Sequence, residues 1–271
     1  MKSTQKIAIL GGGNLGIAIA EGLLRSKSIS PGNISITRRR LELIGHLREK
    51  GIHVSDNNKK AVLNADIILL TVKPQQAETV LKEIKASVSK GKQILVSAVT
   101  GFSIDQIAAI AGTKCPIVRI MPNTAVAIDE SVTCMACAPG FEKEGDLVGV
   151  FLSNLGKTLT VTEELMEAAT VLGACGIAFA LRFLRAMTQG GIEIGFSAET
   201  AQYIASQTLR GAAGLILEKG QHPEREIDKV TTPMGITISG LNEMEHNGFS
   251  SSLIKGLLTS YNKIAASKKK N

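Results

Sequence analysis

Residues 6–16 read KIAILGGGNLG. They join a short apolar strand to the pattern Gly-x-Gly-x-x-Gly, and an amphipathic helix pattern follows. In dinucleotide-binding folds the three glycines serve a tight turn, close approach of the backbone to a pyrophosphate, and close helix–strand packing. Here they are Gly11, Gly13 and Gly16, and the helix N-terminus offers N–H groups to the phosphates. The stretch predicts a dinucleotide site; the alternative is a glycine-rich turn without a ligand.

Apolar runs alternate with helical patterns over the first 160 residues. This alternation predicts βαβ units and a parallel sheet, and Val/Ile/Leu-rich strands are typical of a sheet covered by helices on both faces. The predicted strands are residues 6–10, 34–37, 67–72, 94–98, 117–120 and 132–138, and the predicted helices are residues 15–27, 41–50, 75–86 and 104–111.

The pattern changes after residue 162. Strand-like runs end there, residues 160–163 (TVTE) resemble a capping box, and a helical pattern rich in Gly and Ala continues to Lys263. The sequence therefore predicts an α/β protein of two domains. Residues 1–162 form a Rossmann-type dinucleotide-binding domain, and residues 163–271 form an all-helical domain.

The end of the second predicted strand indicates which dinucleotide binds. NAD sites usually carry an Asp or Glu about 20 residues after the glycine pattern, where it bonds the ribose 2′-OH. Here residues 34–37 are followed by Arg38, Arg39 and Arg40, with no carboxylate. Because a guanidinium pairs with phosphate in a bidentate way, the sequence predicts NADPH rather than NADH, with Arg38 on the 2′-phosphate. The alternative is that the three arginines are solvated charges that open a helix.

The composition argues against several classes of partner. The 271 residues carry a formal net charge of +7, to which the tail at residues 268–270 contributes, and only 3% are aromatic, with no Trp. That is unlike a stacking platform for single-stranded nucleic acid. The longest apolar or Gly run, residues 171–181, is too short to span a bilayer, and the four Cys suit a reducing compartment. We expect a cytoplasmic protein that binds a small molecule, and neither nucleic acid nor a membrane.

The chain offers no sequence pattern for a metal centre. Its four His lack metal-site spacing, and the pair Cys134 and Cys137 has no second pair at zinc-finger spacing. In a strand, residues three apart point to opposite faces. We therefore interpret the two thiols as packed side chains.

Three ordered motifs resemble one known family. They are residues 66–74 (DIILLTVKP), residues 118–124 (VRIMPNT) and residues 230–241 (VTTPMGITISGL). All three resemble segments of the Δ1-pyrroline-5-carboxylate reductases, and with the glycine pattern they cover nearly the full length of the chain.

The resemblance implies reduction of Δ1-pyrroline-5-carboxylate to L-proline with NAD(P)H, the last step of proline biosynthesis. It also implies that the helical domain forms a homodimer, in some members within a ring of dimers, and that the substrate lies under the third motif of the partner subunit. The cofactor contacts it implies are Gly11, Gly13, Asn14, Leu15, Gly16, Thr37, Arg38, Asn58, Val72, Lys73, Pro74 and Ala98. The substrate contacts it implies are Asn123, Cys175, Thr231, Thr232, Gly235, Ile236 and Thr237.

The third motif also has the pattern of a helix start. Thr232 is the predicted N-cap, Pro233 the first helical residue, and residues 247–248 (Asn-Gly) the stop. A helix N-terminus attracts a small carboxylate. Thr237, one turn further, is the catalytic candidate because its hydroxyl can donate to the ring nitrogen. The alternative is a plain capped helix.

The chain departs from the family pattern near the predicted substrate site. Cys175 and Ile177 stand where the family usually has Ser and Pro, and Met234 and Ile236 where it has Gly and Thr. These changes leave two alternatives open: a reductase of another cyclic imine or of an oxo or hydroxy acid, and a non-catalytic NADP-binding regulatory protein. The region between Lys157 and Lys219 lacks the catalytic Lys of the β-hydroxyacid dehydrogenases, which argues against that group.

Overall fold

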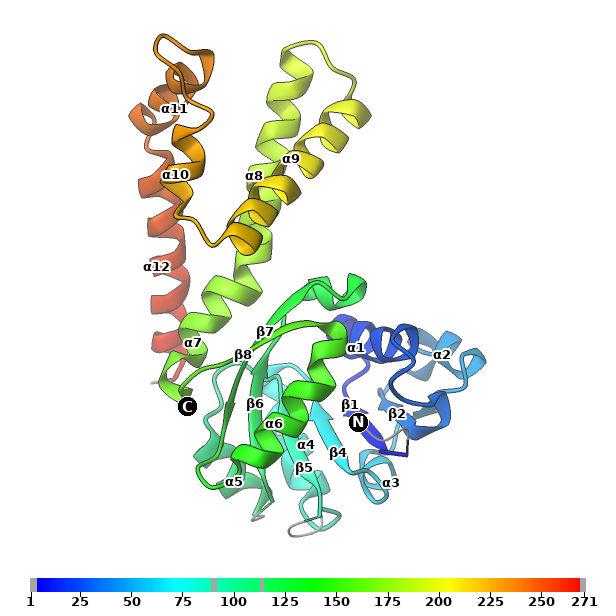
Figure 1. Cartoon of the computed structure of the whole chain (residues 1–271). Helices are drawn as coiled ribbons and strands as arrows, with labels where there is room; N and C mark the ends of the chain where they lie inside the picture. The colour runs from blue at the N-terminus through cyan, green and yellow to red at the C-terminus, as the bar shows by residue number, and fades with distance from the viewer. Residues whose placement is uncertain (1–3, 89–91, 113–114, 269–271) are drawn as a thin grey trace. The chain divides into compact units, whose positions relative to one another are not determined.

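A computed structural model describes residues 4–88, 92–112 and 115–268. The chain divides into two compact units (Figure 1). One comprises Met1–Cys175 together with Tyr261–Asn271, and the other comprises Gly176–Ser260. The predicted domain boundary at residue 162 lies earlier than this division, at the beginning of the long helical segment.

An eight-stranded sheet organises the first unit, in the order β3-β2-β1-β4-β5-β6-β7-β8. The six strands from β3 to β6 are parallel, β7 is antiparallel to β6, and β8 is parallel to β7. The strands are β1 (Ile7–Leu10), β2 (Ile34–Thr37), β3 (His53–Ser55), β4 (Ile67–Leu70), β5 (Ile94–Ser97), β6 (Ile117–Met121), β7 (Ser131–Cys137) and β8 (Gly156–Thr160).

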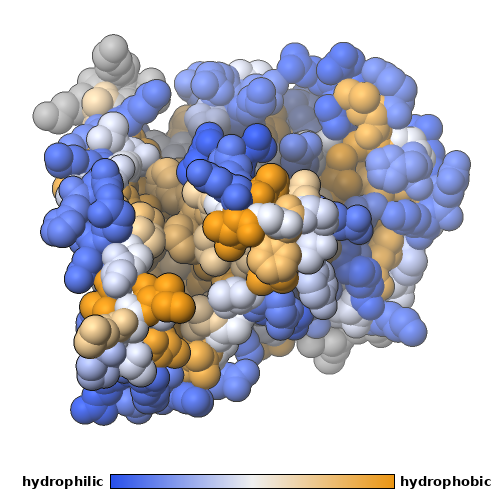
Figure 2. All heavy atoms as spheres, turned by 90° about the horizontal axis from the view of Figure 1, so that it is seen from above, coloured by the Kyte–Doolittle hydropathy of each residue, from blue (hydrophilic) through white to orange (hydrophobic). Residues whose placement is uncertain are grey.

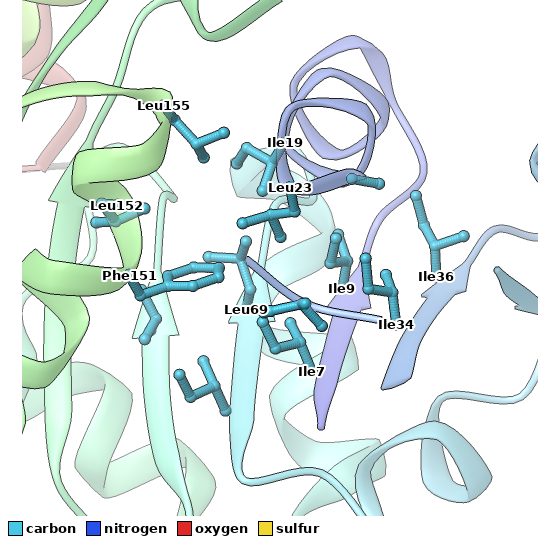
Figure 3. Close-up of a cluster of buried hydrophobic side chains, with 14 of the residues drawn as sticks. Ile7, Ile9, Ile19, Leu23, Ile34, Ile36, Leu69, Phe151, Leu152 and Leu155 are labelled. Atoms are coloured by element: carbon cyan, nitrogen blue, oxygen red, sulfur yellow. The ribbon is translucent and has the colours of Figure 1, made fainter. Parts of the chain in front are cut away.

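Both faces of the sheet are covered by helices (Figure 1). Successive side chains of β1 point to opposite faces, so Ile7 and Ile9 join one core and Ala8 and Leu10 the other. The first core receives Ile19 and Leu23 from α1 and Phe151 from α6 (Figure 3), and the second receives side chains of α4 and α5. The helices of this unit are α1 (Asn14–Arg25), α2 (His46–Glu49), α3 (Asn58–Val62), α4 (Pro74–Ile84), α5 (Ile104–Ala111), α6 (Glu142–Leu152) and α7 (Met166–Ala169).

Every predicted strand is present, but two predicted helical features of the first unit are wrong. The helix expected at residues 41–50 is a 3-10 turn, Leu41–Leu43, followed by the short α2. The turn ends at Ile44, whose φ of −129° is outside the helical range and whose side chain is buried in the first core. The capping box at residues 160–163 does not form, because the Glu163 carboxylate accepts from Ile104 and Arg119 instead. The segment opens instead with a 3-10 turn, Glu163–Leu165.

The second unit contains α8 (Gly176–Glu193), α9 (Ala198–Lys219), α10 (Pro223–Asp228), α11 (Ile236–His246) and the first part of α12 (Phe249–Lys268). Small residues let α8 and α9 approach closely, since a Cβ on Gly191 would lie 2.9 Å from that of Ala201. The rings of Phe183 and Phe249 lie 5.8 Å apart. Many large apolar side chains of this unit remain exposed. Figure 2 shows hydrophobic patches on the face of the molecule that is seen from above.

One helical segment of the described chain, Glu163–Glu193, is long and apolar enough to pass a membrane-span criterion of length and composition. The mean hydropathy of its most apolar 18-residue window is 1.5, and 28% of that window is buried. This differs from the expectation based on the uninterrupted run at residues 171–181, because averaging tolerates the polar residues between apolar ones. Leu172, Leu181 and Ile192 of this segment are exposed, and exposed apolar patches mark interaction sites.

Candidate functional site

The glycine-rich turn packs tightly against the chain that leaves β4. Gly11 has φ +116°, and a Cβ there would lie 2.9 Å from the backbone of Thr71 and Val72. The N–H groups of Gly11 and Gly12 both donate to the Thr37 carbonyl, at 3.2 and 2.7 Å. Only glycine combines this left-handed backbone with such a close approach, so Gly11 makes the turn between β1 and α1.

The other two glycines of the pattern differ from each other. A Cβ on Gly16 would lie 2.2 Å from the Gly11 carbonyl oxygen, whereas a Cβ on Gly13 would meet nothing within 4 Å. The packing of α1 against the glycine-rich turn therefore requires glycine at position 16 and does not require it at position 13. Gly13 is also the N-cap of α1, with no side chain to accept from the first N–H groups. The helix start at Asn14 and Leu15 thus borders open space and presents N–H donors to it.

The end of β2 brings three predicted cofactor residues to this turn. The Thr37 hydroxyl donates to Asn58 Oδ1 at 2.6 Å, and Asn58 Nδ2 donates to Glu83 at 2.8 Å. Arg38 Nη1 donates to the Gly12 carbonyl at 2.6 Å. Arg38 is half-buried, while Arg39 and Arg40 are exposed. The structure therefore distinguishes Arg38 from its two solvated neighbours.

The remaining predicted cofactor residues follow β4 and β5. Lys73 is the N-cap of α4, Pro74 is its first residue, and Val72 precedes them. The Ala98 N–H donates to the Leu70 carbonyl at 2.9 Å. All predicted cofactor residues thus lie at or after the carboxyl ends of β1, β2, β4 and β5, except Asn58, which is hydrogen-bonded to Thr37 at the end of β2. This edge is where open α/β sheets bind nucleotides.

Two predicted substrate residues lie in the first unit. Asn123, which is 8% exposed, accepts from the Ala125 N–H at 2.9 Å and donates through Nδ2 to the Gly173 carbonyl at 3.3 Å. Gly173 belongs to a π-helical segment, Thr170–Cys175, which ends in the half-buried Cys175. Asn123 is therefore attached to the segment that carries Cys175. Single π-turns of this kind occur frequently at functional sites.

The predicted helix start in the third motif is wrong by three residues. Residues 232–235 form a turn in which the Gly235 N–H donates to the Thr232 carbonyl at 2.9 Å, and Gly235 is the N-cap of α11. Pro favours the second position of such a turn as strongly as the first position of a helix, so the motif fits both. Ile236 and Thr237 become the first two helical residues, and both are exposed. The predicted stop holds, since α11 ends at His246 and Gly248 has φ +77°.

Thr231 and Met234 flank this turn with different constraints. The Thr231 hydroxyl donates to the carbonyls of Ile227 and Asp228 at the end of α10, both at 3.2 Å. Met234 has φ +59°, a left-handed backbone, and its side chain is fully exposed. A left-handed residue with a Cβ costs about 1–2 kcal/mol.

Met234→Gly is expected to raise the free energy of unfolding by about 0.5–1 kcal/mol. Relief of the left-handed strain exceeds the extra entropy that Gly gives the unfolded chain. Urea denaturation at one fixed protein concentration measures the change. Met244→Gly inside α11 is the matched control and should lower the same free energy by about 1 kcal/mol. A Met234→Gly variant less stable than the natural chain would contradict the strain argument.

The two thiols of β7 are not paired with each other. Cys134 and Cys137 are free, Cys134 is buried and Cys137 is half-buried. Burial raises the pKa of both thiols, and nearby acidic side chains, Glu142 first, raise that of Cys137 further. Reactive and metal-binding cysteines need the opposite shift. Among the described residues no group of three or more His, Cys, Asp or Glu is placed to hold a metal.

Comparisons with known proteins match both parts of the chain. A family model described as pyrroline-5-carboxylate reductase dimerisation matches residues 163–267, and one described as NADP oxidoreductase, coenzyme F420-dependent, matches residues 6–101. Pyrroline-5-carboxylate reductase 1 of Dictyostelium discoideum is 45% identical over 96% of this chain, which spans 49% of that protein. Pyrroline-5-carboxylate reductase 2 of the same organism is 41% identical, over 98% of this chain and 94% of its own length.

Two solved structures share the fold over nearly the full chain. A pyrroline-5-carboxylate reductase from Coxiella burnetii has a TM-score of 0.88 at 28% identity, and covers 97% of this chain and 98% of its own. A Plasmodium falciparum pyrroline carboxylate reductase with NADP bound has a TM-score of 0.90 at 24% identity, with 98% and 99% covered. This chain thus shares their fold, and it consists of an N-terminal parallel-sheet NADP-binding domain followed by a helical dimerisation domain.

Proposed function

The chain belongs to the pyrroline-5-carboxylate reductase family, and from that premise we propose that it reduces Δ1-pyrroline-5-carboxylate to L-proline with NADPH as the preferred hydride donor. The preference for NADPH rests on Arg38. Its guanidinium bonds the Gly12 carbonyl within the glycine-rich turn, and no carboxylate follows β2 at the position typical of NAD sites. The fold holds the Arg38 guanidinium in place, whereas Arg39 and Arg40 are exposed. We therefore expect a 2′-phosphate at the end of β2 to pair with Arg38.

The experiment compares NADPH with NADH at saturating Δ1-pyrroline-5-carboxylate. We expect kcat/KM to be at least about tenfold higher for NADPH, since one charged hydrogen bond contributes about 1.5–3 kcal/mol. Proline formed equally well with both cofactors would contradict the cofactor assignment and leave the reaction intact. Absence of proline with either cofactor would contradict the reaction itself.

For this reaction the protein must bind the carboxylate of a small substrate and orient the C=N bond of that substrate. When bound, the reduced nicotinamide supplies a hydride to the carbon of the C=N bond, whose nitrogen then carries the electron pair and takes a proton. The N-terminus of α11, with exposed N–H groups and no side-chain cap, suits the carboxylate. Thr237 is exposed in the first turn of α11, and we propose that its hydroxyl donates to the ring nitrogen. The turn before α11 runs from Thr232 to Gly235, Thr231 precedes it, and Ile236 is the first residue of the helix.

Thr237→Val is expected to lower kcat about tenfold without changing the Kd for NADPH. The substitution keeps the shape of the side chain and removes one hydrogen bond, worth about 1–1.5 kcal/mol. Steady-state rates and fluorescence titration with NADPH measure the two quantities. Thr79→Val on the exposed face of α4 is the matched control and should leave both unchanged. An unchanged kcat in Thr237→Val would exclude the role.

The protein forms a homodimer through its helical dimerisation domain. We propose that the exposed apolar side chains of α8, α9, α11 and α12 form this interface, because a single copy leaves Leu181, Tyr203 and Leu217 among others in water. Light scattering is expected to give the mass of a dimer, or an even multiple of the chain mass for a ring of dimers. We also propose a cytoplasmic location, because the four Cys of the sequence suit a reducing compartment.

A further inference from the structure

Arg119 is a charged residue buried inside the sheet. It lies in β6 between apolar neighbours and is 2% exposed. Its guanidinium reaches two carboxylates of one helical segment: Nη1 lies 3.0 Å from Glu163 Oε1, and Nη2 lies 3.4 Å from Glu167 Oε1. Glu163 Oε1 also accepts from the Ile104 N–H at 2.6 Å, in the first turn of α5. One buried arginine thus joins β6, α5 and the segment that begins at residue 163.

This network lies near the two places where the chain passes between the units. The chain leaves the first unit after Cys175 and returns to it at Tyr261. Glu163 and Glu167 belong to the segment that leads to Cys175, the last residue before α8. A cavity of about 300 Å³ is bordered by Arg119, by both glutamates, and by Tyr261 and Ala265 of α12. Residues from Tyr261 onward belong to the first unit again. Arg119 therefore lies beside both connections to the helical unit.

Stability alone gives no reason to place charges here. Desolvation of buried ions offsets most of their attraction, and apolar side chains of similar volume often serve stability as well or better. What an ion triad adds is a fixed geometry, because each carboxylate must meet the planar guanidinium in one register. The role of this network is therefore to fix the position of the helical segment that begins at residue 163 relative to β6.

The Arg119 network lies close in the chain to both predicted substrate residues of this unit, Asn123 and Cys175. Asn123 lies just beyond the end of the strand that carries Arg119, and its side chain bonds the Gly173 carbonyl. The helical segment is thus attached to β6 and its continuation at two places, by Arg119 near its start and by Asn123 near its end. The π-turn at Thr170–Cys175 includes the second attachment and ends at Cys175. A shift at the first attachment changes where Asn123 and Cys175 lie relative to each other.

We propose that Arg119 is a positioning residue of the reductase, which fixes, through Glu163 and Glu167, the register between the strand before Asn123 and the segment that carries Cys175. The inference rests on the proposed function, since it takes Asn123 and Cys175 as part of the substrate site. In this proposal Arg119 acts through its two glutamate partners and not through direct contact with substrate or cofactor. It sets the distance between groups that make such contact, and a misplacement of about 1 Å in such groups can lower a rate by about two orders of magnitude.

The test replaces the ion triad by an uncharged one. In the triple variant Arg119→Met, Glu163→Gln and Glu167→Met, the amide introduced by Glu163→Gln still offers an acceptor to the Ile104 N–H. We expect a melting temperature within about 3 °C of the natural protein and a Kd for NADPH within about twofold. We expect kcat/KM for the imine to fall at least about tenfold, with a larger primary isotope effect from NADPH deuterated at C4, since hydride transfer then limits the rate.

Full kcat/KM and an unchanged isotope effect in this stable variant would overturn the proposal. If the triple variant does not fold, Glu167→Gln alone keeps an acceptor for Arg119. It should then lower kcat/KM about threefold at an unchanged Kd for NADPH, and an unchanged kcat/KM would overturn the proposal equally. Glu78→Gln, which breaks the exposed pair with Lys82 on α4, is the control and should have no effect. A natural protein that does not reduce the imine contradicts the proposed function before any variant is compared.

Discussion

Gly16→Ala is expected to weaken NADPH binding strongly and to lower the free energy of unfolding by roughly 2–3 kcal/mol. The new Cβ would lie 2.2 Å from the Gly11 carbonyl oxygen, which also accepts from the Thr71 hydroxyl at 2.8 Å. The clash is with backbone, so no side chain can turn aside, and α1 must move away from the turn. That movement displaces the helix start from the phosphates, so affinity for NADPH should fall at least about a hundredfold. Fluorescence titration and urea denaturation measure the two losses.

Gly13→Ala separates packing from ligand approach and serves as the matched control. Nothing lies within 4 Å of a Cβ at this position, and its φ of −85° suits any residue. The variant should therefore unfold at the same urea concentration as the natural protein, while NADPH binds roughly tenfold more weakly because the methyl group enters the space for the pyrophosphate. Equal stability losses in the two variants would contradict the roles assigned to Gly13 and Gly16.

Arg38→Asp is expected to weaken NADPH about a hundredfold and NADH much less. The substitution removes a charged hydrogen bond worth about 1.5–3 kcal/mol and places a carboxylate beside the 2′-phosphate. The lost bond to the Gly12 carbonyl affects both dinucleotides equally, so the ratio of the two Kd values isolates the phosphate contact. Titrations with each cofactor at the same ionic strength give that ratio.

Arg39→Asp changes the net charge by the same amount at an exposed position and should alter the ratio only slightly. Equal loss of NADPH and NADH affinity in Arg38→Asp would remove the basis for the NADPH preference. A large selective loss in Arg39→Asp would move the phosphate contact to that residue.

The central strands were predictable because both of their faces are buried. Residues 7–10 and 67–70 are uninterrupted apolar runs, and β1 and β4 form from them with every side chain buried. The strands missed, β3 and β8, lie at the two edges of the sheet and carry mostly half-buried or exposed side chains. An edge strand has a neighbouring strand on one side only and buries few of its side chains, so its residues show little apolar pattern.

The candidate site was predictable where glycine sterics fix a role. Gly11 and Gly16 lie where a Cβ would meet backbone atoms, as their residue type required. Arg38 lies beside the glycine-rich turn, and its contact with a 2′-phosphate stays a prediction. The third motif was misread at its start, because Thr-Pro fits a turn as well as a helix N-terminus. The Arg119 network was missed. Its signal was a single charge inside the apolar run at residues 117–121, and nothing in the sequence indicates that its partners lie more than 40 residues away.

The most direct measurement follows NADPH absorbance in the near ultraviolet with and without Δ1-pyrroline-5-carboxylate, together with the amount of proline formed. We predict that NADPH is consumed only when the imine is present, with one proline formed per NADPH oxidised. A protein that binds NADPH tightly but forms no proline would contradict the proposed reaction. The replacements at Cys175, Ile177, Met234 and Ile236 would then mark a pocket for another imine or a regulatory role.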